Sequence, residues 1–192
     1  MGFSPLAYVN VKGFLDPNPD RAAMAYWSAR QGLSLAETIS FTDGTKVHVE
    51  QALCANAFGA TLVRDGLTGR RVRALTDTDY LVDAARRLSR PVSDFVLAPD
   101  APPGVFVLAD HPVRARLPHY GPYEKLLTRR RSAYLLLRPF HLCALEVAKG
   151  LRKARDGAPP TLTNGAVPHA SVSAVAKRDL PAGTRLGRAI GS

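Results

Sequence analysis

Short apolar segments, separated by longer stretches of helical character, most constrain how this chain can fold. Leu6–Val11 and the apolar run within Gly104–Leu108 have the length and composition of buried strands, and Tyr134–Leu137 is similar to them. Asp94–Leu97 is a further β-like segment. The expected helices are 20–29, 46–58, 76–88 and 142–153. This order of elements predicts an α+β fold, in which helices cover a mixed or antiparallel sheet.

Local signals mark several ends of these helices. Asp20 can cap the first helix and Gly32 would end it, because aspartate accepts from backbone N–H groups and glycine adopts left-handed angles. The better buried positions of this helix are expected to be Ala22, Ala23, Tyr26 and Trp27. Gly59 would end the helix 46–58, and 40–45 is expected to be a turn that leads into it.

The C-terminal segment has a different residue pattern from the rest of the chain. Val172, Ala174 and Ala176 alternate with other residues, and Asp179–Thr184 has the composition of a tight turn. This pattern predicts a β-hairpin. We therefore interpret 1–192 as one domain, with an α+β body at 1–168 and a C-terminal β-hairpin lobe at 169–192.

The balance of charge narrows the class of partner. Lys and Arg number 26 against 16 Asp and Glu, which gives a net charge of +10 and a pI of about 10.1. Such a chain favours anionic partners: phosphorylated or carboxylated metabolites, nucleic acid, or an acidic protein. No zinc-finger spacing or aromatic RNA-binding motif supports nucleic acid. A small anionic metabolite is therefore the favoured ligand.

Targeting signals and cysteine usage predict a cytoplasmic protein. The cysteines, Cys54 and Cys143, are far apart and read as free thiols in a reducing compartment. The first residues do not show a charged segment followed by an apolar run, as a secretory leader would. No apolar run approaches the roughly 18 residues that span a bilayer.

Common nucleotide, nucleophile and metal motifs are absent from the sequence. It contains no Gly-x-Gly-x-x-Gly, no P-loop and no Gly-x-Ser-x-Gly. It also has no His-Glu-x-x-His and no pair of Cys-x-x-Cys motifs. We therefore expect neither a dinucleotide site of the usual kind nor a metal site within 1–192.

Four stretches in order resemble one family of enzymes. They are Lys12–Pro17, Ser40–Lys46, Arg138–Val147 and Val175–Gly183. Together they look like the homoserine-dehydrogenase-like oxidoreductases with a SAF-type hairpin, which include the deoxyxylulose-phosphate-reductoisomerase-like (DRL) enzymes. The resemblance extends from about Val9 to Ile190.

The resemblance implies a substrate-binding domain that normally works beside a Rossmann domain. In such enzymes the Rossmann domain comes first and binds NADPH, and the segment similar to this chain holds the substrate. Because the sequence encodes no nucleotide cofactor site, the resemblance implies NADPH only if a partner Rossmann-fold protein supplies it. It also implies a homodimer.

Lys46 is the first candidate for catalysis. It follows the Asp43-Gly44-Thr45 turn at the start of a helix, where an ammonium can bind a carboxylate or phosphate, or protonate a developing alkoxide. The alternative is a surface ion pair with Glu50, four residues later. Glu50 could also complete a catalytic lysine–carboxylate pair. Asp43 is a candidate general base or an ordinary helix cap, and Thr45 a candidate hydrogen-bond donor to substrate.

A second group of candidates lies at an expected strand–helix junction. His141 could act as acid or base near neutral pH, and Arg138 could clamp an anionic group with two hydrogen bonds. The alternatives are a helix-capping histidine and a structural pair between Arg138 and Glu146. The remaining candidates for substrate binding are Lys12, Asn56 and Glu146. His48 points about 160° away from Glu50 on the same helix, which favours a non-catalytic role.

Three functional classes remain open at this point. The first is a cofactor-independent enzyme that uses Lys46, Asp43 and His141 for proton transfer, as in isomerisation, cyclisation, elimination or another lyase reaction, on a small anionic metabolite. The second is the substrate-binding subunit of a split NADPH-dependent oxidoreductase or reductoisomerase. The third is a non-catalytic binding protein for an acidic ligand. The first is favoured, because all the residues expected to contact substrate are present.

Overall fold

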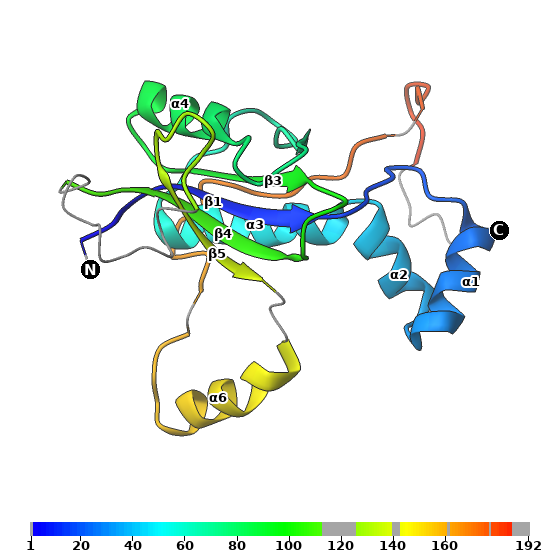
Figure 1. Ribbon diagram of the computed structural model, residues 1–192. Coiled ribbons are helices and arrows are strands. Elements are labelled where there is room, and N and C mark those ends of the chain that lie inside the picture. The colour runs from blue at the N-terminus through cyan, green and yellow to red at the C-terminus, as the bar shows by residue number, and fades with distance from the viewer. Residues whose placement is uncertain (1, 113–125, 140–142, 161, 177, 186–192) are drawn as a thin grey trace.

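A five-stranded mixed sheet forms the centre of the molecule in a computed structural model, which describes residues 2–112, 126–139, 143–160, 162–176 and 178–185. The strands are β1 (Ser4–Lys12), β2 (Arg70–Arg71), β3 (Val92–Leu97), β4 (Gly104–Asp110) and β5 (Tyr134–Pro139), in the order β2-β3-β1-β4-β5 (Figure 1). Strand β3 runs parallel to both β1 and β2, whereas β4 is antiparallel to β1 and β5. The expected α+β class with a mixed sheet is confirmed.

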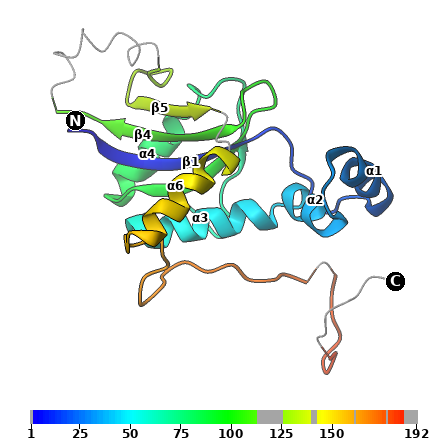
Figure 2. The ribbon, with the colours of Figure 1, turned by 90° about the horizontal axis from the view of Figure 1, so that it is seen from below.

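Two helices cover opposite faces of this sheet. They are α3 (Thr45–Phe58) and α4 (Asp79–Leu88), which Figure 1 and Figure 2 show on either side of β1. Helices α1 (Arg21–Gln31) and α2 (Leu35–Thr42) form a hairpin beside the sheet, and α6 (Cys143–Arg155) lies apart from it (Figure 1). Within the parts of the chain that the structure describes, no helix has the length and apolar character needed to cross a membrane.

The two faces of β1 differ in chemistry. Ala7, Val9 and Val11 are buried and pack with Leu81 and Val82 of α4 in the main hydrophobic core. Because successive side chains of a strand point to opposite faces, the intervening residues turn towards α3. These residues are Tyr8, Asn10 and Lys12. The apolar face therefore holds the fold together, and the other face places polar groups beside α3.

Helix ends follow the sequence signals closely. The Asp20 carboxylate accepts from the Ala23 N–H at 2.7 Å and starts α1, while Gly32 ends it with φ of 66°. Gly59 likewise ends α3 with φ of 63°. The expected turn at 40–45 is shorter than predicted, because a capping box between Ser34 and Glu37 starts α2 and the helix continues through Thr42.

The prediction that α1 buries its aromatic residues is wrong. Tyr26 is 58% and Trp27 44% exposed, and the buried residues of this helix are Met24 and Ser28. The reason is that α1 packs against α2 and not against the sheet, so that only a narrow stripe of the helix is covered.

The predicted C-terminal hairpin is only partly present. The Thr184 N–H and hydroxyl both donate to the Pro181 carbonyl, at 3.1 and 2.6 Å, which forms the expected tight turn. The described residues of 169–185 nevertheless contain no strand. Val175 is 86% exposed, and an isolated two-stranded hairpin without a packed face is marginally stable. Lys177 and 186–192 lie outside the described residues.

Candidate functional site

A polar cluster lies where β1 ends over the first half of α3. Glu50 of α3 accepts a hydrogen bond from the Asn10 Nδ2 at 2.8 Å, and its carboxylate is 3.8 Å from the Lys12 ammonium. Both partners come from β1, forty residues or so earlier in the chain. The docking of α3 on the sheet therefore holds Glu50 between an amide and an ammonium group.

Lys12 is the member of this cluster with the strongest indication of acid–base chemistry. Its side chain is only 17% exposed. Burial lowers the pKa of Lys12 from its ordinary value, Glu50 opposes this by raising it, and the positive charge of Lys46 lowers it further. A lysine in such surroundings gives up its proton more readily than a solvated one, so it can both donate and accept a proton.

Lys46 adds a second positive charge to the cluster. Its ammonium lies over the Phe41 ring, 3.8 Å from the ring centroid, and the residue is exposed. It belongs to the first turn of α3, where backbone N–H groups also favour an anion. Lys46 also interacts electrostatically with Glu37, so the two lysines face two carboxylates in all. Lys46 is the more exposed of the two lysines and is therefore the better placed to meet a carboxylate or phosphate ligand.

Asp43 and Thr45 form the turn that starts α3. The Asp43 carboxylate accepts from the Thr45 N–H at 2.8 Å, and Gly44 between them has φ of 90°. Asp43 thus closes a turn one residue before Gly44, which is the N-cap of α3 and has no side-chain cap of its own. The turn fixes where α3 begins, and it thereby positions Lys46 and Glu50.

An acceptor atom in the cluster lacks a hydrogen-bond partner among the described residues. Asn10 is 6% exposed, and its Oδ1 is buried without a partner. The orientation of the amide is set by Glu50, because a carboxylate accepts and the Nδ2 must face it. Asn10 Oδ1 therefore keeps an unused acceptor capacity inside the cluster, shielded from solvent. The sequence analysis did not single out Asn10; its polar side chain within an apolar strand was the available signal.

Other predicted site residues lie elsewhere. The Asn56 Oδ1 accepts from the N–H groups of His169 and Ala170 at 3.0 and 2.9 Å, and its Nδ2 donates to the Ala170 carbonyl and to Asn164. Asn56 thus binds the chain's own C-terminal segment. The His48 ring lies 3.2 Å from the Gly66 carbonyl, in keeping with the non-catalytic role expected for it.

The strand–helix junction contributes one described pair to the neighbourhood. Arg138 forms an ion pair with Glu146, and their side chains are 66% and 43% exposed. Arg138 faces Val105 across β4 and β5, and Val105 faces Asn10 across β4 and β1, so Arg138 lies two strands from Asn10 on one face of the sheet. His141 lies outside the described residues.

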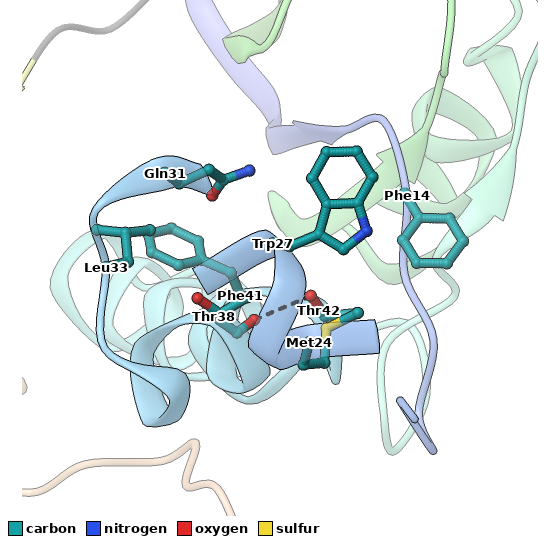
Figure 3. A pocket seen from close by; sticks show the side chains of 8 residues that line it. All are labelled: Phe14, Met24, Trp27, Gln31, Leu33, Thr38, Phe41 and Thr42. Atoms are coloured by element: carbon teal, nitrogen blue, oxygen red, sulfur yellow. Dashed lines mark hydrogen bonds between the residues drawn. The ribbon is translucent and has the colours of Figure 1, made fainter. Parts of the chain in front are cut away.

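An apolar cavity of about 600 Å³ has in its wall the Phe41 ring, which the Lys46 ammonium contacts (Figure 3). It lies between α1, α2 and the loop that follows β1. Its large apolar side chains are Phe14, Met24, Trp27, Leu33 and Phe41. The Asp16 N–H donates to the Thr42 carbonyl at 2.9 Å and so ties the loop to the end of α2. The sequence analysis missed this cavity, because it expected Trp27 to lie in the core.

Cys54 of α3 is an unreactive thiol, and the described residues show no metal centre. Burial raises the pKa of Cys54 to about 11, with a hydrogen bond from Ser93 acting in the opposite direction. In the described parts of the chain, no group of three or more His, Cys, Asp or Glu side chains is arranged to hold a metal ion.

Most of the chain, including every strand of the sheet, matches one family of catalytic domains. The profile of the family described as "Oxidoreductase DRL, catalytic domain" matches residues 1–147, so the chain belongs to this family. Three of the four stretches that carried the resemblance fall within this range, and Val175–Gly183 lies beyond it. A comparison with curated proteins found no match.

Proposed function

We propose that Lys12, Glu50, Asn10 and Lys46 form the substrate-binding and proton-transfer site of an oxidoreductase-type catalytic domain that acts on a small anionic metabolite. The observation that carries this proposal is the mostly buried Lys12 ammonium, whose pKa is lowered by burial and which lies beside Glu50. A lysine that is perturbed by burial and paired with a specific carboxylate is a candidate for acid–base chemistry.

The proposed roles follow from the charges of these groups. Lys46 and the N-terminus of α3 bind the carboxylate or phosphate of the substrate. Lys12 donates one proton to a substrate oxygen on which negative charge develops, and becomes a neutral amine. Glu50 holds Lys12 in place and stabilises its protonated form when the amine takes a proton back from solvent.

The turn that follows β1 does not resemble the glycine-rich turn that binds the phosphates of a dinucleotide cofactor. Strand β1 leads into the loop 13–20 instead of a glycine-rich turn that opens a helix, and the next helix begins only at Arg21. The usual cradle of backbone N–H groups for a pyrophosphate is thus not formed after this strand. The proposed proton transfer accordingly uses only side chains of this chain.

Two reactions would use the same proton transfer. In the first, a partner Rossmann-fold unit holds NADPH and supplies the hydride, while Lys12 supplies the proton; the family to which the chain belongs favours this reaction. In the second, proton transfer alone isomerises, cyclises or cleaves the substrate. The acid–base pair of Lys12 and Glu50, complete within one chain, favours the second.

Binding of simple anions tests the site before the substrate is known. Calorimetric titration with phosphate and with malonate should give at least tenfold weaker binding for Lys12→Met and Lys46→Met than for the unsubstituted protein, because each removes one of two positive charges. Lys149→Met, on the exposed surface of α6, is the matched control and should bind as before. Equal binding by all the proteins would show that the site is assigned wrongly.

Turnover then separates the two reactions. A panel of small oxo acids should be incubated in deuterium oxide without cofactor, and separately with NADPH and a purified Rossmann-fold partner. Deuterium incorporation next to the carbonyl without cofactor supports isomerase-like chemistry, and NADPH oxidation that requires both proteins supports the oxidoreductase. Either activity should fall by about 100-fold or more in Lys12→Met. An activity that survives this substitution would remove Lys12 from the proton transfer.

A further inference from the structure

We infer that the apolar cavity beside Lys46 receives the apolar part of the substrate, which is therefore an amphipathic anion: a carboxylate or phosphate joined to an aryl or alkyl group. The inference rests on the proposed function in one respect, the assignment of Lys46 to the anionic group. The inference goes beyond the proposed function because it names the class of substrate.

The cavity has the size and lining of a small-molecule site. Its volume of about 600 Å³ lies within the range of roughly 300–1,000 Å³ that is typical of ligand pockets. Three aromatic side chains from separate segments line it: Phe14 from the loop after β1, Trp27 from α1 and Phe41 from α2 (Figure 3). They are 64%, 44% and 42% exposed, so large apolar surfaces here remain uncovered by the chain itself. Such surface favours an apolar ligand.

The polar side chains at the wall of the cavity are largely satisfied by their own helix. The Thr42 hydroxyl donates to the Thr38 carbonyl at 2.9 Å, which Figure 3 shows as a dashed line, and the Thr38 hydroxyl donates to the Ser34 carbonyl at 3.1 Å. These hydroxyls are therefore not available to donate to a ligand. The wall therefore presents mainly apolar area, and the Gln31 amide is its remaining polar side chain.

Lys46 connects the cavity with the polar cluster. Its ammonium lies 3.8 Å from the centroid of the Phe41 ring, which is itself part of the wall, so a positive charge stands at the rim of an apolar space. Phe14, which also lines the cavity, is two residues beyond Lys12 in the loop after β1. A neutral ligand would leave this charge unused, and a cationic one would be repelled by it.

The position of the chain's single tryptophan provides a direct measurement. Because the sequence contains one Trp and it lines the cavity, its fluorescence reports occupancy without interference from other tryptophans. We would titrate the whole chain with 4-phenylbutyrate, with 4-phenylbutanol as the uncharged probe, and with butyrate as the probe that lacks the aryl group. Saturable fluorescence changes are expected for the first two, with the carboxylate binding at least tenfold more tightly than the alcohol.

Substitutions separate the two ends of the site. Lys46→Met should reduce the affinity for 4-phenylbutyrate to that for the alcohol and leave the alcohol unchanged. Leu33→Asp should weaken both aryl probes by at least tenfold, and Leu33→Phe, which fills the cavity with an apolar group, should do the same in a chain that keeps its fold. Val167→Asp, an exposed apolar position of the C-terminal segment, is the matched control and should have no effect.

Several outcomes would overturn the inference. They are a fluorescence signal that does not saturate, equal affinity for the acid and the alcohol, or binding that is unaffected by both Leu33 substitutions. A fluorescence signal that varies with protein concentration and a larger mass by light scattering, if both persist when Leu151 of α6 is replaced by Asp, would assign the cavity to a second copy of the chain and also overturn the inference.

The inference and the proposed function can fail separately. If 4-phenylbutyrate does not bind but phosphate and malonate still depend on Lys12 and Lys46, the cavity is not a substrate site and the proposed function stands. If 4-phenylbutyrate binds with the expected dependence on Lys46 while Lys12→Met keeps full turnover, the cavity is a ligand site and the proposed proton transfer is wrong.

Discussion

At the scale of single residues, surroundings decide which groups of this molecule are reactive. Lys12 and Cys54 are both shielded from solvent, and burial disfavours the charged form of each. For the lysine this makes a proton easier to release, which suits acid–base work. For the thiol it suppresses the nucleophilic thiolate. The same physical cause therefore favours chemistry at Lys12 and opposes it at Cys54.

The pKa of Lys12 should depend on Glu50. The carboxylate raises this pKa against the effect of burial, so Glu50→Gln should lower the pKa of Lys12 further from the ordinary value of 10.5. Competitive labelling with acetic anhydride over a range of pH, read by mass spectrometry, gives the midpoint for each lysine. Lys149 on the exposed surface of α6 provides the internal control. A Lys12 midpoint that stays the same or rises in Glu50→Gln would contradict the pairing.

The same lowered pKa affects stability in a definite direction. In the unfolded chain Lys12 regains its ordinary pKa and binds a proton more tightly than in the folded chain. Between the folded value and about 10.5, the contribution of Lys12 to the free energy of unfolding therefore increases with pH. At pH values below both the folded and the unfolded pKa, burial of the Lys12 ammonium lowers the free energy of unfolding. Such a cost is expected of a side chain that serves chemistry and not packing.

At the scale of secondary-structure elements, α3 contacts two parts of the chain that are far apart in sequence. Its first half holds Glu50 against β1, and its second half holds Asn56 against the C-terminal segment. The His169 ring adds a contact of 2.8 Å to the Ala60 carbonyl just beyond the helix. One helix thus connects the polar cluster with the segment that follows α6.

Asn56→Ala should release the C-terminal segment from α3. The substitution removes acceptors for the His169 and Ala170 N–H groups, and each such bond is worth about 1 kcal/mol. Hydrogen exchange at these two amides should therefore become roughly tenfold faster or more. Asn164→Ala removes only the exposed hydrogen bond between the Asn56 Nδ2 and the Asn164 side chain. It should therefore increase exchange at residues 169 and 170 by less than Asn56→Ala does. Unchanged protection at 169–170 in Asn56→Ala would show that Asn56 does not hold the C-terminal segment against α3.

Sequence patterns predicted most elements because their signals are local. Asp20, Gly32 and Gly59 act through contacts within a few residues, and all three lie where they were expected. The error at Trp27 has a different origin, since burial of a helix face depends on which element packs against it. The sequence alone placed Lys12 only among the further candidates for substrate binding, because its surroundings also depend on which element packs against it. Its partner Glu50 lies far along the chain, and their pairing exists only once α3 is docked.

At the scale of the whole molecule, part of the positive charge is compensated internally. Arg129 pairs with Asp77 at 2.6 Å, and Arg130 pairs with Asp83 at 2.5 Å. The ion pairs of these two arginines are consistent with a structural role. The cluster of Lys12 and Lys46 is therefore the better candidate for anion binding.

Helix α6 provides the surface for the homodimer that we propose. Val147 and Leu151 lie four residues apart on one face of α6 and are 56% and 67% exposed. Light scattering should give twice the chain mass of 20.7 kDa for the unsubstituted protein, and Leu151→Asp should shift the equilibrium to monomer by at least tenfold. Lys149→Asp, on another face of the helix, should not. A monomer at all concentrations would exclude the homodimer.

The division of β1 into an apolar and a polar face has a consequence for how reliably the chain folds. A slip of β1 by one residue against β3 would turn Tyr8, Asn10 and Lys12 into the core beneath α4, where an amide and an ammonium group would lose their solvation. The residues that perform the proposed chemistry therefore also exclude the mispaired sheet. Replacing Asn10 and Lys12 together by valine would be expected to remove the site and to leave the alignment of the central strands poorly determined.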